Sequence, residues 1–237
     1  MATLLSALET QARRHLVEAT ASFWSSAELI DIMNGGIRDL WRPVVDLKQE
    51  HFLTVDATNV TLAASTPTLS GIPSDVHKVY LIEARDTSST SANKNLEFKP
   101  LDYNHPIFQA ARSQDDVDPS NGVIYYCVTG AGSPTGASST VIEVAPEINA
   151  AMNVRFVYVP TIVAKVAADI NPIPAGSDNA LVAWTVAFAR AKEREDRSPD
   201  PNWLAIYATE KQSLLQSLGL RQLQEPTYVD GVFDHLW

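Results

Sequence analysis

The 237-residue sequence predicts an α+β fold, with a pair of amphipathic helices at each end and short strands between them. Near both ends, apolar residues recur at spacings of three and four, which is the period of a helix. From residue 51 to residue 159 they fall in short runs separated by turn residues, which is typical of strands. Neither helix pair can bury its apolar stripe alone. We therefore expect the two pairs to form a four-helix bundle with an inserted antiparallel all-β region.

The best-defined element of the prediction is the helix between Trp24 and Pro43. Ser25 and Glu28 have the spacing of a capping box at a helix start, and Pro43 is expected to end the helix. Trp24 and Trp41 are assigned to the packing of this helix. Its apolar stripe consists of Leu29, Ile30, Met33, Ile37, Leu40 and Trp41.

Two adjacent glycines, Gly35 and Gly36, interrupt this helix. Together they should destabilise the helix by about 2 kcal/mol relative to two alanines. Either the helix bends at this point or another backbone packs unusually close to it. We prefer close packing and assign both glycines to helix packing.

The domain boundaries follow from the change of pattern along the chain. The remaining helices are expected at residues 2–20, 180–197 and 203–218, with Gly219 as a C-terminal stop. The predicted parts are the first half of the helical bundle at 1–47, the inserted β domain at 48–160, the second half of the bundle at 161–219, and an extended C-terminal tail at 220–237.

Within the β domain the sequence predicts two hairpins and several further strands. The first hairpin would join 51–55 to 60–62, and the second would join 123–129 to 140–145. Further strands are expected at 76–85, 96–100 and 152–160, with a brief helix at 104–113 lying over the sheet.

Charge and composition restrict the class of protein. The net charge of −10, from 28 acidic and 18 basic residues, argues against a surface built to neutralise phosphates. This negative charge is compatible with a surface that serves only solubility, and also with the wall of a channel past which DNA slides. There is no signal-peptide pattern and no apolar run of about 18 residues, so we expect a soluble protein with no membrane association. The single cysteine, Cys127, excludes an internal disulfide and points to a reducing compartment.

No motif predicts catalysis, a cofactor or a metal. The five histidines are scattered, no Gly-x-Ser-x-Gly elbow occurs, and the glycines of the 130–136 loop lack dinucleotide-binding spacing. The expectation is a protein that is not an enzyme, with no catalytic, cofactor-binding or metal-binding residues.

The densest basic cluster and the aromatic tail are the remaining candidate surfaces. The basic residues of 190–197 alternate with acidic ones, so a solvated helix end is favoured over phosphate contact. The tail carries Tyr228, Phe233 and Trp237 in a segment with no period of its own. Such aromatics would be costly to leave in water, so they should dock either on this chain or on a partner, and we assign them to partner binding.

Four segments in order along the chain share a pattern with a known family. They are 24–40, 71–79, 143–146 together with 154–161, and 180–191 together with Asp200 and 205–211. In these segments the sequence resembles the head-to-tail adaptor (connector) proteins of tailed bacteriophages. The resemblance spans most of the chain and consists of apolar and turn residues.

The resemblance implies a structural virion protein at the head–tail interface, assembled in the host cytoplasm. Its partners would be further copies in a ring, commonly of twelve, the portal protein, and tail or nozzle proteins. The ring would sit beneath the portal, extend the DNA channel and provide the tail attachment platform, and double-stranded DNA would pass through its lumen without specific binding. Other possibilities are a tail-completion or decoration subunit, or a small-molecule-binding β module.

Overall fold

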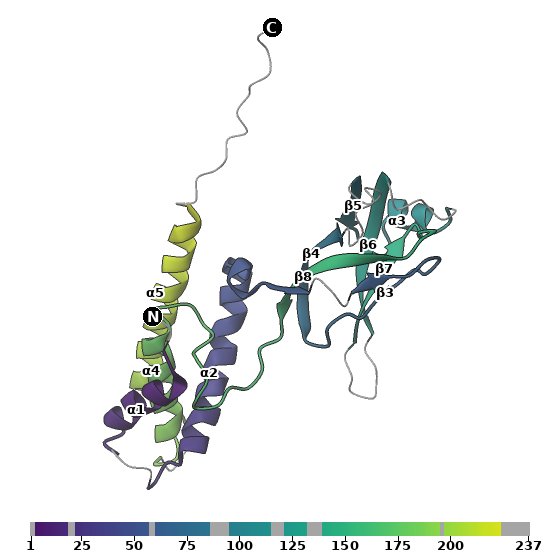
Figure 1. The fold of residues 1–237 in the computed structure, drawn as a ribbon. Helices are drawn as coiled ribbons and strands as arrows, with labels where there is room; N and C mark the ends of the chain where they lie inside the picture. The colour runs from purple at the N-terminus through teal and green to yellow at the C-terminus, as the bar shows by residue number, and fades with distance from the viewer. Residues whose placement is uncertain are drawn as a thin grey trace. The chain divides into compact units, whose positions relative to one another are not determined.

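A computed structural model describes residues 3–18, 22–56, 60–85, 95–114, 121–131, 139–194 and 197–223 (Figure 1). The chain divides into two compact units. The helical unit comprises Met1–His51 and Ile162–Trp237, and the β unit comprises Phe52–Thr161. The predicted α+β class is confirmed.

The helical unit is built around α4, which packs against the three other long helices. Most residues of α4 are buried, because alanines and small apolar side chains occupy several of its faces. The helices are α1 (Leu5–His15), α2 (Ser26–Leu47), α4 (Asp178–Arg190) and α5 (Pro201–Leu223), and a 3₁₀ turn, η1 (Gln49–Phe52), follows α2.

The helix α2 does not end at Pro43, as the sequence predicted, but continues to Leu47. A proline inside a helix leaves the carbonyl four residues earlier without its backbone donor. Here that carbonyl belongs to Asp39, and the Lys211 ammonium of α5 lies 3.5 Å from it and 2.6 Å from the Asp39 carboxylate. Val44 and Val45 beyond the proline are buried and hold the last turn in place.

The helix α5 also runs past its predicted end, continuing through Gly219 to Leu223. Leu214 and Leu218 are buried just before the glycine, and the residues that follow it in sequence are good helix formers. A single glycine costs only about 1 kcal/mol in a helix, which does not terminate it.

The glycine pair of α2 lies against α4. Trp184 of α4 donates its indole N–H to the Ile32 carbonyl at 3.0 Å, which places its ring across the glycines. A Cβ built on Gly36 would lie 2.8 Å from the ring, whereas one on Gly35 would lie 3.5 Å from it. What approaches the glycines is therefore an indole ring and not a second backbone.

The β unit contains two sheets. One has five strands arranged around β8, with β4 on one side and β1, β2 and β3 on the other, and the second has the order β5-β6-β7. Its elements are β1 (Thr54–Asp56), β2 (Thr61–Leu62), β3 (Leu69–Ser70), β4 (Val76–Arg85), β5 (Asn95–Pro100), α3 (Pro106–Ala111), β6 (Asn121–Ala131), β7 (Ser139–Ala145) and β8 (Met152–Pro160).

The two sheets share one apolar core. Ile82 of β4, Ile124 of β6 and Phe156 of β8 are buried in the same cluster. The sheets are also joined through the backbone, since the N–H of Val144 donates to the carbonyl of Pro67 at 2.8 Å. The shared core makes this region a single unit.

The first predicted hairpin is wrong. Both β1 and β2 pair antiparallel with β8, Thr54 opposite Tyr158 and Thr61 opposite Asn153, so they lie along the same side of one strand. The hairpin in this part of the chain is β2–β3, with Thr61 opposite Ser70. The second predicted hairpin is confirmed as β6–β7.

The β unit is also not purely antiparallel, because β5 and β6 run parallel. A parallel pair needs a crossover connection of about a dozen residues or more. Residues 101–120 provide that length, and they include the short helix α3 that the sequence predicted at 104–113.

Within the described part of the chain, no helix has the length and apolar character needed to cross a bilayer.

We predict opposite effects for alanine at the two glycines of α2. Gly36→Ala should lower the free energy of unfolding by up to about 2 kcal/mol, because overpacking against Trp184 costs about 1–3 kcal/mol and the gain in helix propensity is only about 1 kcal/mol. Gly35→Ala has room for its methyl group and should raise the free energy of unfolding. Urea unfolding of both variants tests this, and equal stabilities would contradict it.

Candidate partner-binding site

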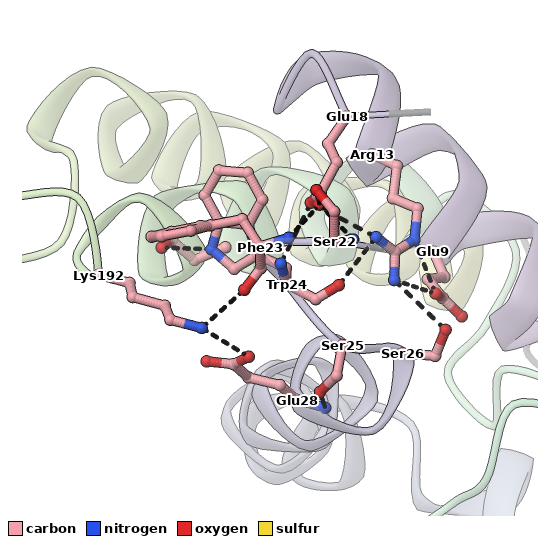
Figure 2. A network of polar contacts seen from close by, with 11 residues as sticks. Glu9, Arg13, Glu18, Ser22, Phe23, Trp24, Ser25, Ser26, Glu28 and Lys192 are labelled. Carbon is pink, nitrogen blue, oxygen red and sulfur yellow. Dashed lines mark hydrogen bonds and ion pairs between the residues drawn. The ribbon is translucent and has the colours of Figure 1, made fainter. Parts of the chain in front are cut away.

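The turn that leads into α2 is held by one carboxylate. Glu18, just beyond α1, accepts hydrogen bonds from the backbone N–H groups of Ser22 at 2.6 Å, of Trp24 at 3.2 Å, and of Phe23 (Figure 2). It also accepts from the Ser22 hydroxyl at 2.8 Å. Three successive N–H groups bound to one side chain fix the backbone of this turn, residues 22–25, which we call the Phe23 turn.

The buried guanidinium of Arg13 connects α1 to the same turn. Its Nε donates to Glu9 Oε1 at 2.9 Å and its Nη1 donates to the Trp24 carbonyl at 3.0 Å (Figure 2). Its Nη2 lies 3.3 Å from the Ser26 hydroxyl, and Nη1 lies 3.6 Å from the Glu18 carboxylate. A buried arginine is tolerated only when its charge and its donors are satisfied, and two carboxylates do this here.

The hydrogen bonds to Glu18 change its acidity. Burial acts to raise the pKa of this carboxyl, but the donors from Phe23, Ser22 and Trp24 outweigh burial and lower the pKa from 4.5 to about 2. Glu18 is therefore charged across the physiological pH range, and its charge stabilises the folded turn.

The turn presents an exposed aromatic side chain in a fixed position. Phe23 is 47% exposed, yet its carbonyl accepts from Lys192 Nζ at 2.8 Å, and the same ammonium lies 4.7 Å from the ring centroid. The neighbouring Trp24 is buried and donates its indole N–H to the Ala189 carbonyl of α4 at 3.0 Å. An aromatic ring that is already immobilised loses little entropy when it binds a partner.

The start of α2 only partly follows the predicted capping box. The Ser25 hydroxyl accepts from the Glu28 N–H at 3.2 Å, as expected of an N-cap. The Glu28 carboxylate, however, forms an ion pair with Lys192 at 3.1 Å. The second half of the capping box is replaced by a contact between helices.

The sequence predicted a solvated helix end for the basic residues of 190–197, but two of these residues are bound to other helices. Arg190 pairs with Asp200 at 3.2 Å and donates to the His15 carbonyl at 3.0 Å. Lys192 is bound to Phe23 and Glu28. These two cations hold the ends of α1, α2, α4 and α5 together.

A second surface is formed by the extended segment at residues 162–170, which follows β8. The side-chain amide of Asn34 in α2 accepts from the Lys165 N–H at 2.8 Å and donates to the Lys165 carbonyl at 2.9 Å. The segment also caps α1, since the N–H of Leu5 donates to the Asp169 carbonyl at 2.9 Å. Held in this way, it exposes Val163 at 60% and Val166 at 62%.

Between this segment and α2 lies an open cavity of about 310 Å³, which we call the α2 groove. Its lining includes Ala27, Ile30 and Asp31 from α2 and Lys165 and Val166 from the segment. The floor is apolar and the charged groups are a carboxylate and an ammonium. A hollow of this composition suits an apolar side chain from a partner.

The structure describes one of the two groups of residues that were assigned from the sequence. Gly35, Gly36, Trp24 and Trp41 all lie in or next to α2, and both tryptophans are buried. The proposed partner-binding aromatics Tyr228, Phe233 and Trp237 lie outside the described residues.

Two features of the site were missed from the sequence. Phe23 was not assigned to the site from the sequence, and its position depends on Lys192, which is distant in the chain. The segment at 162–170 was assigned only to the second half of the bundle at 161–219 and not to a binding surface, although its repeated valines between two structured regions could have indicated one.

The described residues contain no group of three or more His, Cys, Asp and Glu side chains that could hold a metal. The β unit has a cavity of about 430 Å³ whose lining includes Asp102, Tyr103, His105 and Cys127. This lining is mixed and differs from the large apolar pocket expected of a small-molecule-binding β module.

A fixed exposed aromatic and an apolar groove on an α+β scaffold are surface features of the kind that protein–protein contacts use. Residues 3–230 match the family model of the SU10 adaptor protein. The chain therefore belongs to the SU10 adaptor family, a family of phage head-to-tail adaptors. No curated protein matches the chain.

Membership of this family has direct consequences for function. The family is a structural one, so the protein is a structural adaptor of a phage and a component of the virion. It associates with portal and tail proteins.

The low pKa of Glu18 predicts a pH-dependent contribution to stability. Because the folded-state pKa of about 2 lies below the ordinary 4.5, the contribution is complete above about pH 5 and is lost as the pH falls through 2. Glu18→Gln should therefore unfold at lower urea than the unmodified protein above pH 5, and the difference should shrink between pH 4.5 and 2. Urea titrations at several pH values test this, with Glu50→Gln, an exposed carboxylate, as control. A difference that does not change with pH would contradict it.

Proposed function

We propose that this protein forms a ring below the portal, where it extends the DNA channel and provides the platform to which the tail attaches. The single observation that carries the proposal is the match to the adaptor family over almost the whole chain, residues 3–230. A match of this length includes both the helical unit and the β unit.

In this proposal the helical unit builds the wall of the ring. The helices α1, α2, α4 and α5 act as a four-helix bundle around α4, and the Phe23 turn and the α2 groove lie on its surface. Both are fixed apolar features, which is what a subunit needs to bind neighbours without large rearrangement.

The other parts of the chain have complementary roles. The β unit docks on tail or nozzle proteins, and the residues beyond α5, which carry Tyr228, Phe233 and Trp237, reach along the portal. The net charge of −10 supports a lumen that repels DNA and lets it slide. Assembly takes place in the host cytoplasm.

The first test is electron microscopy of the purified protein with and without the portal of the same phage. We expect rings, commonly of twelve subunits, bound to the portal side that faces the tail. Binding to the capsid surface instead would favour a decoration subunit and contradict the proposal. The same reconstruction examines the lumen, and a basic lumen would contradict the sliding role.

The second test is deletion of residues 224–237, which leaves α5 intact up to Leu223. We expect weaker binding to the portal, because anchoring aromatic side chains carry a large part of the binding free energy of many interfaces. Circular dichroism and urea unfolding serve as controls for folding. Portal binding equal to that of the full chain would show that the tail is not the anchor.

A further inference from the structure

The Phe23 turn and the α2 groove are complementary in shape. One is an aromatic ring that projects from a fixed turn, and the other is an apolar hollow of about 310 Å³. Apolar cavities of about 150 Å³ hold a benzene ring, so a phenyl side chain fits in the groove with space left for the adjoining backbone.

The two features lie on different sides of the helical unit. Ala27 in the groove and Gly36 are nine residues apart on α2, which at about 100° per residue places them about 180° apart around the helix. Gly36 faces Trp184 of α4, so the groove faces away from α4. Phe23, in contrast, lies beside Lys192, just beyond the end of α4 (Figure 2).

A projection and a hollow on different sides of one subunit are the elements of a head-to-tail contact. Such a contact repeats from copy to copy and closes into a ring when the rotation permits. A two-fold contact would instead require one surface that is complementary to itself.

The charges beside the two features are also complementary. Lys192, with a side chain 42% exposed, and Glu28 flank Phe23, while Asp31 and Lys165 flank the groove. Lys192 and Glu28 form an ion pair within one copy, and when the ring of that copy enters the groove of another, this pair can lie against Asp31 and Lys165 with opposite charges facing each other. Pairing of this kind favours the correct orientation of the two copies.

We propose that Phe23 of each subunit inserts into the α2 groove of the next copy of the chain, between Ala27, Ile30 and Val166. This inference rests on the proposed ring, and it assigns the contact that joins neighbouring subunits.

Cysteine crosslinking tests the contact directly. In a full-length Cys127→Ala background, Ser22→Cys and Val166→Cys are combined in one chain, so that the Phe23 ring next to the exposed Ser22 is kept. The chain is treated with a short bis-maleimide, with portal and also without portal at high protein concentration. We expect a ladder of dimers, trimers and larger products on a denaturing gel. The control pair of Ser22→Cys with Gln212→Cys, which places the second thiol on the exposed face of α5, should give no ladder.

Three crosslinking results would overturn the proposal. One is the absence of a ladder when rings are seen on the portal. Another is an equal ladder from the control pair. The third is dimers from Ser22→Cys alone, which would indicate a two-fold contact. Because rings are scored separately by microscopy, failure of the wild-type protein to form them counts against the proposed function, while the samples without portal still test the contact.

Complementation of two variants provides a second test. Phe23→Ala removes the projecting ring, and Ala27→Trp fills the groove from an exposed position. Each alone should reduce the yield of rings at least about tenfold, since loss of an interface anchor costs that much or more. Mixed together, they retain one intact contact per pair and should give dimers but no rings.

The same samples control for misfolding of the variants and for the portal as the alternative occupant of the α2 groove. Urea unfolding shows whether each variant remains folded, and the crosslinking pair does not depend on either substitution. If Val166→Cys is protected from maleimide by portal, and Phe23→Ala in the same chain leaves that protection unchanged, the portal occupies the groove and the proposal is wrong.

Discussion

The indole of Trp184 resting on Gly36 sets the distance between α2 and α4, and the candidate site depends on that distance. With the helices this close, the indole of Trp24 reaches the Ala189 carbonyl, and Lys192 reaches both the Phe23 carbonyl and Glu28. A side chain larger than hydrogen at Gly36 would move all of these contacts together. Close packing of two helices therefore fixes the position of a surface residue outside both of them.

Local patterns predicted the elements of the fold well, and long-range contacts explain where they failed. The strands β4 and β8 begin and end where the sequence placed them, and both contribute side chains to the core of the β unit. Pro43 was expected to end α2, but Lys211, far along the chain, compensates the carbonyl that the proline leaves free. The predicted hairpin failed because β1 and β2 share a third partner, β8, which lies 90 to 104 residues further along the chain.

The candidate site was less predictable than the fold. The cap at Ser25 and the importance of the glycines follow from residues close in sequence. In contrast, the position of Phe23 depends on Lys192, and the extended segment is held by Asn34 across more than 130 residues. Charge and apolar content indicate that such residues can bind a partner, but only the packing of α4 brings them to fixed positions.

The helical unit is assembled from both ends of the chain, and this has a consequence for the order of events during synthesis. The stripes of α1 and α2 have no partner until α4 leaves the ribosome, because the β unit is made between them. Ala189 and Lys192, which hold Trp24 and Phe23, belong to the last quarter of the chain. A nascent chain therefore lacks the contacts that hold these two aromatic residues against α4, and only a nearly completed polypeptide presents Phe23 beside Lys192 to other molecules.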